Sequence, residues 1–187
     1  MAGLGGNNVR KRADPRLKRK STMERIALEK MFFELYETES DALFRFVFFF
    51  LFNREWAQDI VQETFAKYWE VLASEKPIEN ERALLFSIAS HKVIDWYRKK
   101  KEYSLDQLME SGFDTSRSEA VSIEARLDTE EALRVLRTLP KKYQEVVWLR
   151  SVEEWSVQDI AAYVQDSVNV VSVRIHRGIR LWRERIG

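Results

Sequence analysis

The sequence contains no cysteine and only two histidines, His91 and His176. Disulfides and thiolate metal sites require cysteine, so both are excluded, and two histidines in separate segments offer too few ligands for a structural zinc ion. We therefore expect no metal and no cofactor. The sequence patterns of serine hydrolases, zinc proteases and glycine-rich phosphate loops are also missing, so we expect neither an enzyme nor a small-molecule substrate.

An apolar run long enough to cross a membrane is missing as well. The strongest candidate, residues 43–52, would extend only about 15 Å as a helix, against a hydrocarbon core of about 30 Å. Arg45 also interrupts it. The glycine-rich residues 1–8 are followed by charge, the reverse of a secretory signal. We expect a buried helix, no stable membrane insertion and a cytoplasmic protein.

Proline and glycine are scarce, with 3 and 6 respectively in 187 residues, whereas hydrophobic residues make up 45%. Large apolar residues recur at helical spacing, which predicts an all-α fold. The formal net charge is only +1, but it is segmented: nine acidic residues oppose two arginines between residues 102 and 131. The segments predict two small helical domains joined by an acidic flexible linker.

Four parts follow from these patterns. They are a basic flexible tail at residues 1–22, a four-helix unit at 23–101, an acidic linker at 102–128 and a helix-turn-helix domain at 129–187. In the four-helix unit we expect helices from about 23, 40, 56 and 82, with a break before Ser40 or Asp41. A loop is expected at residues 74–81 because Pro77 disfavours helix at the residue before it.

Two helix faces in the four-helix unit carry candidate binding residues. Asp59, Gln62 and Glu63 share one face at i, i+3 and i+4 and could accept hydrogen bonds from arginines of a partner. A solvated helix face is the alternative. The last helix combines aromatic and basic residues: His91, Lys92, Trp96, Tyr97, Arg98 and Lys99. This mixture is typical of a surface that binds nucleic-acid strands, although the aromatic residues could equally belong to the core.

The chain closes with a helix-turn-helix pattern. Ser156 and Asp159 form a capping-box-like start, and Ser167 can cap the final helix after the turn at Gln165. Its expected inward positions are Val168, Val171, Ile175, Ile179 and Trp182. Its expected outer face is Asn169, Ser172, Val173, His176, Arg177 and Arg180, with Val170 also exposed. Short side chains followed by arginines suit a helix in a DNA major groove, and a solvated arginine-rich helix is the alternative.

Four stretches resemble the extracytoplasmic-function (ECF) sigma factors of the sigma-70 family, in family order and spacing. They are Asp59–Trp69, Leu85–Ala89 with Ile94–Arg98, Leu139–Val146, and Ser156–Arg177. The resemblance covers about residues 29–101 and 129–185. It implies an alternative sigma factor that binds core RNA polymerase and directs promoter-specific initiation, with residues 23–101 as region 2 and residues 129–187 as region 4.

The resemblance also implies partners and contact residues. Contacts to the β′ clamp helices of polymerase would come from Asp59, Gln62, Glu63 and Phe65. Contacts to the −10 element would come from Lys76, Asn80, His91, Lys92, Trp96, Tyr97, Arg98 and Lys99. Contacts to the −35 element would come from Ser167, Asn169, Val170, Ser172, Val173, Arg174, His176, Arg177 and Arg180. Region 4 would also lean on the β flap, and an anti-sigma factor is an expected partner.

Some positions depart from the family pattern. Ser90-His91 stands where Arg-Asn is usual, and Gln165 stands where a turn glycine is frequent. If Gln165 adopts a left-handed conformation, we expect a cost of about 1 kcal/mol. The rival function is a polymerase-independent helix-turn-helix regulator with residues 23–101 as a dimerisation bundle. That rival predicts tight duplex binding by the free protein, whereas a single small reading helix predicts weak binding.

Overall fold

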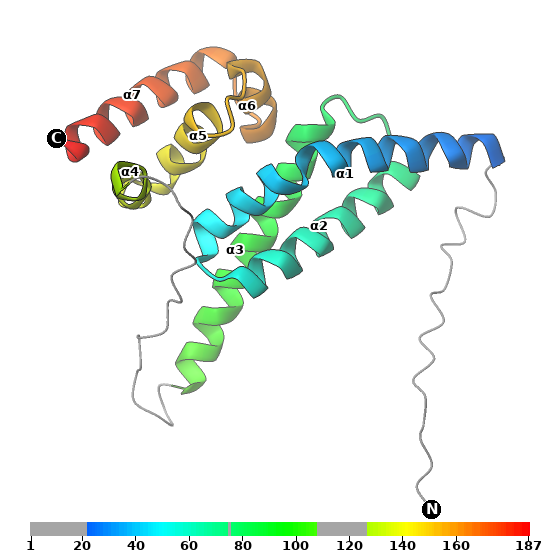
Figure 1. Ribbon diagram of the computed structural model, residues 1–187, viewed down its shortest axis with the longest axis horizontal. Helices are drawn as coiled ribbons and strands as arrows, with labels where there is room; N and C mark the ends of the chain where they lie inside the picture. Colours follow the sequence, from blue (N-terminus) through cyan, green and yellow to red (C-terminus); the bar gives the residue numbers. More distant parts are fainter. Residues whose placement is uncertain (1–21, 75, 108–126) are drawn as a thin grey trace, which may run out of the picture.

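The computed structural model describes residues 22–74, 76–107 and 127–187. Within these ranges the chain forms helices and no strand, which confirms the all-α prediction. The helices are α1 (Thr22–Leu51), α2 (Arg54–Ala73), α3 (Glu81–Gln107), α4 (Leu127–Arg137), α5 (Lys141–Ser151), α6 (Val157–Val164) and α7 (Val168–Ile186). Residues 1–21 of the predicted tail and 108–126 of the predicted linker lie outside the described residues. Helices α1 to α3 form one group and α4 to α7 a second (Figure 1).

Helix α1 is continuous over 30 residues, so the prediction of two helices with a break before Ser40 was wrong. The intervening residues are polar, but none is glycine or proline. Thr38 donates its hydroxyl to the carbonyl of Glu34 at 2.9 Å, within the helix, instead of ending it. Glu39 pairs with Arg82 of α3 at 2.8 Å. The first group therefore contains three helices, not four.

The turns around α2 follow local sequence signals. Phe52 has a φ of 56°, and the side chain of Asn53 accepts the backbone N–H of Trp56 at 2.9 Å to cap α2. The predicted loop after Ala73 is present, and the side chain of Asn80 accepts the N–H of Ala83 at 2.8 Å as α3 begins. Helix α3 continues to Gln107, six residues beyond the predicted end at 101.

The apolar run at residues 43–52 is buried between helices. Leu43, Phe46 and Val47 are fully buried, and Phe46 meets Phe86 of α3 with ring centroids 5.3 Å apart. This confirms the predicted buried helix. Across the described helices, none has both the length and the apolar character needed to cross a membrane.

Close contact between α5 and α7 organises the second group. A side chain at Gly178 would place its Cβ 2.6 Å from Val147 Cγ2, so only glycine fits there without a shift. Val171 and Ile175 are buried as predicted, whereas Val168, expected to face inward, is 43% exposed in the first turn of α7. The indole N–H of Trp182 donates to the carbonyl of Ala132 at 2.8 Å and ties α7 to α4.

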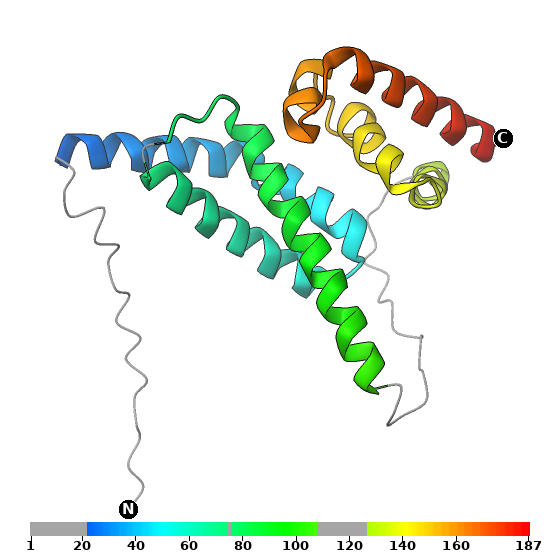
Figure 2. The same cartoon turned by 180° about the vertical axis from the view of Figure 1, so that it is seen from behind.

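The two groups share one continuous hydrophobic core. Aromatic rings meet across the boundary: Phe49 and Trp148 have centroids 4.3 Å apart, and Phe86 and Trp155 have centroids 4.8 Å apart. Figure 2 shows the second group against α1 and the first turns of α3. Burying such rings contributes about 2 to 3 kcal/mol each, so the groups form one packed body in this structure.

Candidate functional site

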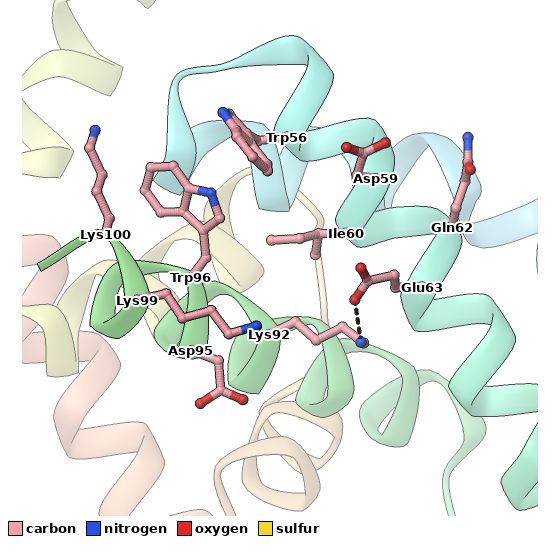
Figure 3. A pocket seen from close by; sticks show the side chains of 10 residues that line it. All are labelled: Trp56, Asp59, Ile60, Gln62, Glu63, Lys92, Asp95, Trp96, Lys99 and Lys100. Atoms are coloured by element: carbon pink, nitrogen blue, oxygen red, sulfur yellow. Dashed lines mark hydrogen bonds and ion pairs between the residues drawn. The ribbon is translucent and has the colours of Figure 1, made fainter. Parts of the chain in front are cut away.

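A groove of about 680 Å³ lies between α2 and α3 (Figure 3). Its lining residues are Trp56, Asp59, Ile60, Gln62, Glu63, Lys92, Asp95, Trp96, Lys99 and Lys100. The groove brings together two sets that lie far apart in sequence. One is the acceptor patch of α2, defined as Asp59, Gln62 and Glu63, and the other is the basic and aromatic part of α3.

Glu63 and Lys92 connect these two sets. The Nζ atom of Lys92 lies 2.7 Å from Oε2 of Glu63, and the Glu63 side chain remains 64% exposed. An exposed pair of this kind contributes only about 0 to 1 kcal/mol. Asp59 and Gln62 have no hydrogen-bond or ion-pair partner in the described part of the chain, and both point away from α3 in Figure 3. These two residues are available to an external partner.

Phe65 does not belong to this surface. It is 4% exposed and packs against Tyr36 of α1, with ring centroids 4.7 Å apart. The groove between α2 and α3 does not include Phe65 among its lining residues. The expectation of a direct contact to a partner at Phe65 is therefore corrected to a role in the core between α1 and α2.

Two tryptophans form the aromatic part of the groove. The rings of Trp56 and Trp96 have centroids 6.0 Å apart, and Nζ of Lys100 lies 4.9 Å from the centre of the Trp96 ring. Trp56 is 48% exposed. The sequence pattern does not single out Trp56, because it belongs to α2 and only the packing of α2 on α3 places it beside Trp96. Exposed aromatic rings beside lysines can stack unpaired bases and neutralise phosphates.

The residues predicted for the −10 element do not all lie in this groove. Lys92, Trp96 and Lys99 line the groove, whereas Lys76 is exposed in the loop before α3 and Arg98 pairs with Asp95 at 3.1 Å. Three others face the second group of helices: Asn80 in the loop before α3, and His91 and Tyr97 on α3 itself. Asn80 donates its amide to Asp159 of α6 at 2.8 Å.

The helix-turn-helix of α6 and α7 has the predicted caps. Ser156 accepts the N–H of Asp159 at 3.1 Å, and Ser167 accepts the N–H of Val170 at 3.4 Å. Gln165 ends α6 with φ 56° and ψ 41°, the left-handed conformation that the sequence analysis considered. Because a side chain is disfavoured there, the turn is strained by about 1 kcal/mol.

The outer face of α7 presents short side chains first and arginines later. Asn169, Val170, Val173, His176, Arg177 and Arg180 are exposed, and Ser172 is half-buried. Arg174 pairs with Asp166 of the turn at 2.6 Å. Lys142 of α5 lines a shallow groove of about 400 Å³ together with Val173 and Arg177. The sequence pattern does not single out Lys142, because this residue comes from another helix and carries no local signal.

No cluster of His, Asp or Glu side chains among the described residues is arranged to hold a metal ion. The chemistry of both surfaces is that of binding: hydrogen-bond acceptors on α2, aromatic rings and cations in the α2–α3 groove, and a mixed polar and cationic face on α7.

Comparison with known families gives matches in both groups of helices. Residues 35–103 match the model of Sigma-70 region 2, and residues 129–181 match that of Sigma-70, region 4. The RNA polymerase sigma factor YlaC of Bacillus subtilis (strain 168) is 30% identical over 156 residues, covering 82% of this chain and 88% of that protein. The ECF RNA polymerase sigma factor SigX of the same organism is 24% identical over 165 residues, covering 85% of each.

Solved structures show the same fold. The sigma factor RpoE, co-crystallised with the anti-sigma factor NepR from Bartonella quintana, has a TM-score of 0.65 at 22% identity, covering 83% of this chain and 96% of that chain. CnrH, in complex with the cytosolic domain of CnrY, has a TM-score of 0.63 at 25% identity, covering 84% and 88%. The two family models, in order along the sequence, and the relatives YlaC and SigX show that the chain belongs to the extracytoplasmic-function sigma factors of the sigma-70 family.

Proposed function

We propose that this protein is an alternative sigma factor that binds core RNA polymerase and directs initiation at promoters with −10 and −35 elements. The observation that carries the proposal is the α2–α3 groove, where unpartnered acceptors adjoin an aromatic and cationic surface. Region 2 is assigned to helices α1 to α3 and region 4 to helices α4 to α7. Such factors act by binding, without catalysis of their own, in the cytoplasm.

The polymerase contact is assigned to Asp59 and Gln62, with Glu63 beside them. Their carboxylate and amide oxygens can accept charge-assisted hydrogen bonds from basic side chains of the β′ clamp helices. Support comes from their exposure and lack of partners in the described chain. Glu63 contributes less because Lys92 already neutralises it at 2.7 Å.

The −10 contact is assigned to the tryptophan pair and the lysines around it. Trp56 and Trp96 offer ring faces to an unstacked base, while Lys92, Lys99 and Lys100 line the same groove. A strand entering the groove would place its phosphates beside the lysines and its bases beside the rings. This arrangement suits single-stranded DNA better than a duplex, whose bases are stacked inside.

The −35 contact is assigned to α7. Asn169, Val170 and Val173 near its N-terminus are short enough to meet base edges in a major groove, and an exposed valine suits a thymine methyl group. Arg177 and Arg180 are exposed one and two turns later and meet phosphates. Region 4 would also contact the β flap of polymerase.

An anti-sigma factor is proposed as a further partner. RpoE is described in complex with the anti-sigma factor NepR, and CnrH in complex with the cytosolic domain of CnrY. The present chain covers 96% and 88% of these two neighbours, which supports a similar regulator here.

Run-off transcription with core RNA polymerase on a promoter library tests the function. We expect discrete transcripts only when the protein and core enzyme are combined, and weak binding to duplex DNA by the protein alone. Tight and specific duplex binding by the free protein, with no core-dependent transcript, would instead support a polymerase-independent helix-turn-helix regulator.

A further inference from the structure

We propose that Lys142 of α5 contacts a DNA phosphate of the −35 element beside Arg177, and that Arg174 of α7 is paired within the protein instead of contacting this element. The inference rests on the proposed function. It adds a second helix to the surface that holds the duplex, and it removes one of the arginines that the sequence predicted for DNA contact.

The groove of about 400 Å³ between α5 and α7 brings Lys142 to the reading face. Its α7 wall includes Asn169, Val173 and Arg177, and its α5 wall is formed by Lys142 and Tyr143 from the first turn of that helix. The candidate base contacts and the candidate phosphate contact of α7 therefore share one groove with a lysine of another helix. A strand whose bases meet α7 would pass beside the start of α5.

A glycine in α7 allows α5 to come this close. A Cβ atom at Gly178 would lie 2.6 Å from Cγ2 of Val147 and 3.3 Å from Cβ of Tyr143, so a larger residue would push the two helices apart. Tyr143 directly follows Lys142 in the first turn of α5. The close approach therefore holds the backbone of Lys142 at the edge of α7, and the long side chain extends from a fixed position.

Lys142 keeps its positive charge available for an external anion. Its side chain is exposed, and its Nζ lies 5.0 Å from the ring centre of Tyr143. The first turn of α5 contains no acidic residue, and within the described part of the chain neither Lys142 nor Arg177 forms an ion pair. Two cations without a countercharge on opposite walls of one groove attract a phosphate that lies between them.

The neighbouring lysine has different surroundings. Nζ of Lys141 lies 5.3 Å from the ring centre of Tyr97 in α3, and Lys141 does not line the groove between α5 and α7. Two lysines with the same charge at successive positions of one helix therefore differ in whether they adjoin the reading face. Lys141 is thus a matched control for Lys142.

Arg174 is engaged inside the helix-turn-helix. Its guanidinium donates to Oδ2 of Asp166 at 2.6 Å, and its side chain is only 25% exposed. Asp166 is fixed in turn, because its backbone N–H donates to the carbonyl of Ala161 in α6 at 3.1 Å. Asp166 lies two residues before α7 begins, where an unpaired carboxylate would repel a phosphate. Arg174 neutralises this carboxylate, and the pair adds no net positive charge to the DNA-binding face.

The salt dependence of duplex binding tests the contact of Lys142. The full-length protein, without polymerase, is titrated at low salt with the duplex best retained from a random library. In Lys142→Ala we expect the slope of log affinity against log salt to fall by about 1. The loss of affinity relative to wild type should therefore shrink about fourfold when the salt concentration is raised fourfold.

Lys141→Ala removes the same charge one position earlier and should keep the slope of wild type. Equal slopes for Lys142→Ala and wild type would overturn the phosphate contact, and so would equal reductions in Lys142→Ala and Lys141→Ala. Wild-type protein that binds no duplex at low salt would also contradict it. Circular dichroism spectra of the variants check that their helices are intact.

A charge-neutral double variant tests the role of Arg174. Arg174→Gln with Asp166→Asn removes both charges of the pair and keeps side chains of similar size. We expect this variant to have the same salt slope as wild type. A slope reduced by about 1 would show that Arg174 contacts a phosphate and would overturn its assignment to Asp166. Because these titrations contain no polymerase, a lack of core-dependent transcripts would contradict the proposed function and not this inference.

Discussion

At the scale of single residues, the acceptor patch shows that two carboxylates on one helix can differ in whether they are free to bind a partner protein. Asp59 and Glu63 both carry exposed carboxylates on α2, but Glu63 forms an ion pair with Lys92, whose Nζ lies 2.7 Å from Oε2 of Glu63. Asp59 has no such partner in the described part of the chain. The difference could not be read from the sequence, because Lys92 is 29 positions from Glu63 and reaches it only through the packing of α3 on α2.

Reversing the charge at Asp59 should therefore abolish polymerase binding. In Asp59→Arg, a repulsive cation replaces the unpartnered acceptor, and we expect at least tenfold weaker co-purification with core enzyme with an unchanged circular dichroism spectrum. Glu70→Arg is the control on the same helix, outside the groove. Equal retention of both variants by core polymerase would exclude the assigned contact.

Removing the exposed ring at Trp56 should weaken strand binding. Stacking of a base on an aromatic side chain contributes about 1 to 3 kcal/mol, which corresponds to a loss of roughly 5- to 150-fold in Trp56→Ala. The readout is affinity of the reconstituted holoenzyme for a single-stranded −10 oligonucleotide. Phe33→Ala is the control: it removes a ring on α1 that is 60% exposed and lies outside the groove, and it should leave the affinity unchanged. A similar loss in both variants would point to general destabilisation.

At the scale of elements, helical spacing and capping residues predicted most boundaries. Asn53, Ser156 and Ser167 cap helices through local hydrogen bonds, and local signals are visible in sequence. The break predicted in α1 before Ser40 was wrong for another reason. Glu39 in this polar stretch forms an ion pair with Arg82 of α3, and such a tertiary contact leaves no local signal in the sequence. Phe65 was expected in the polymerase contact from the family resemblance alone, and the packing of α1 on α2 buries it.

The strained turn between α6 and α7 offers a stabilising change. Gln165 has a φ of 56°, and glycine adopts that conformation without a steric penalty. Gln165→Gly should raise the free energy of unfolding by about 0.5 to 1 kcal/mol, measured by chemical denaturation. Gln144→Gly, at a residue inside α5, should instead lower the free energy of unfolding. A destabilised Gln165→Gly protein would show that the glutamine side chain has a role of its own in the turn.

The reading helix should separate phosphate contacts from base contacts. Arg177→Ala should weaken duplex binding about equally across promoter sequences and reduce the slope of log affinity against log salt by about 1. Val173→Ala should instead change the preferred −35 bases. Selection of bound sites from a random library measures both effects. A sequence-specific effect of Arg177→Ala would assign it to a base edge.

At the scale of the whole molecule, the interface between regions 2 and 4 should respond to pH through Glu145. Burial raises the pKa of this carboxyl above its ordinary value of 4.5, and nearby hydroxyls and cations oppose the shift. The groups that face it are Ser90 and His91 of α3, Lys141 of α5, Tyr163 of α6 and Arg174 of α7. A carboxyl with a raised pKa favours the folded state most when protonated. That contribution is complete below the ordinary value and is lost as pH rises through the raised pKa.

Glu145→Gln removes this titration. As pH falls from 7 through the raised pKa towards 4.5, the Tm of wild type should increase relative to that of Glu145→Gln. Thermal unfolding of both proteins across this pH range measures the difference in Tm. The other titrating groups are the same in both proteins, so their contributions to Tm cancel in this difference. A constant difference in Tm would show that Glu145 does not change its charge on folding.

The uninterrupted length of α1 has a mechanical consequence. A 30-residue helix extends about 45 Å, and its two halves cannot tilt independently without breaking backbone hydrogen bonds. Its first half packs against α2 through Phe32 and Tyr36, and near its end the carbonyl of Phe49 accepts a hydrogen bond from Arg137 of region 4 at 3.1 Å. A partner that displaces the first turns of α1 by a few ångströms would therefore also shift its last turns and disturb their contact with region 4.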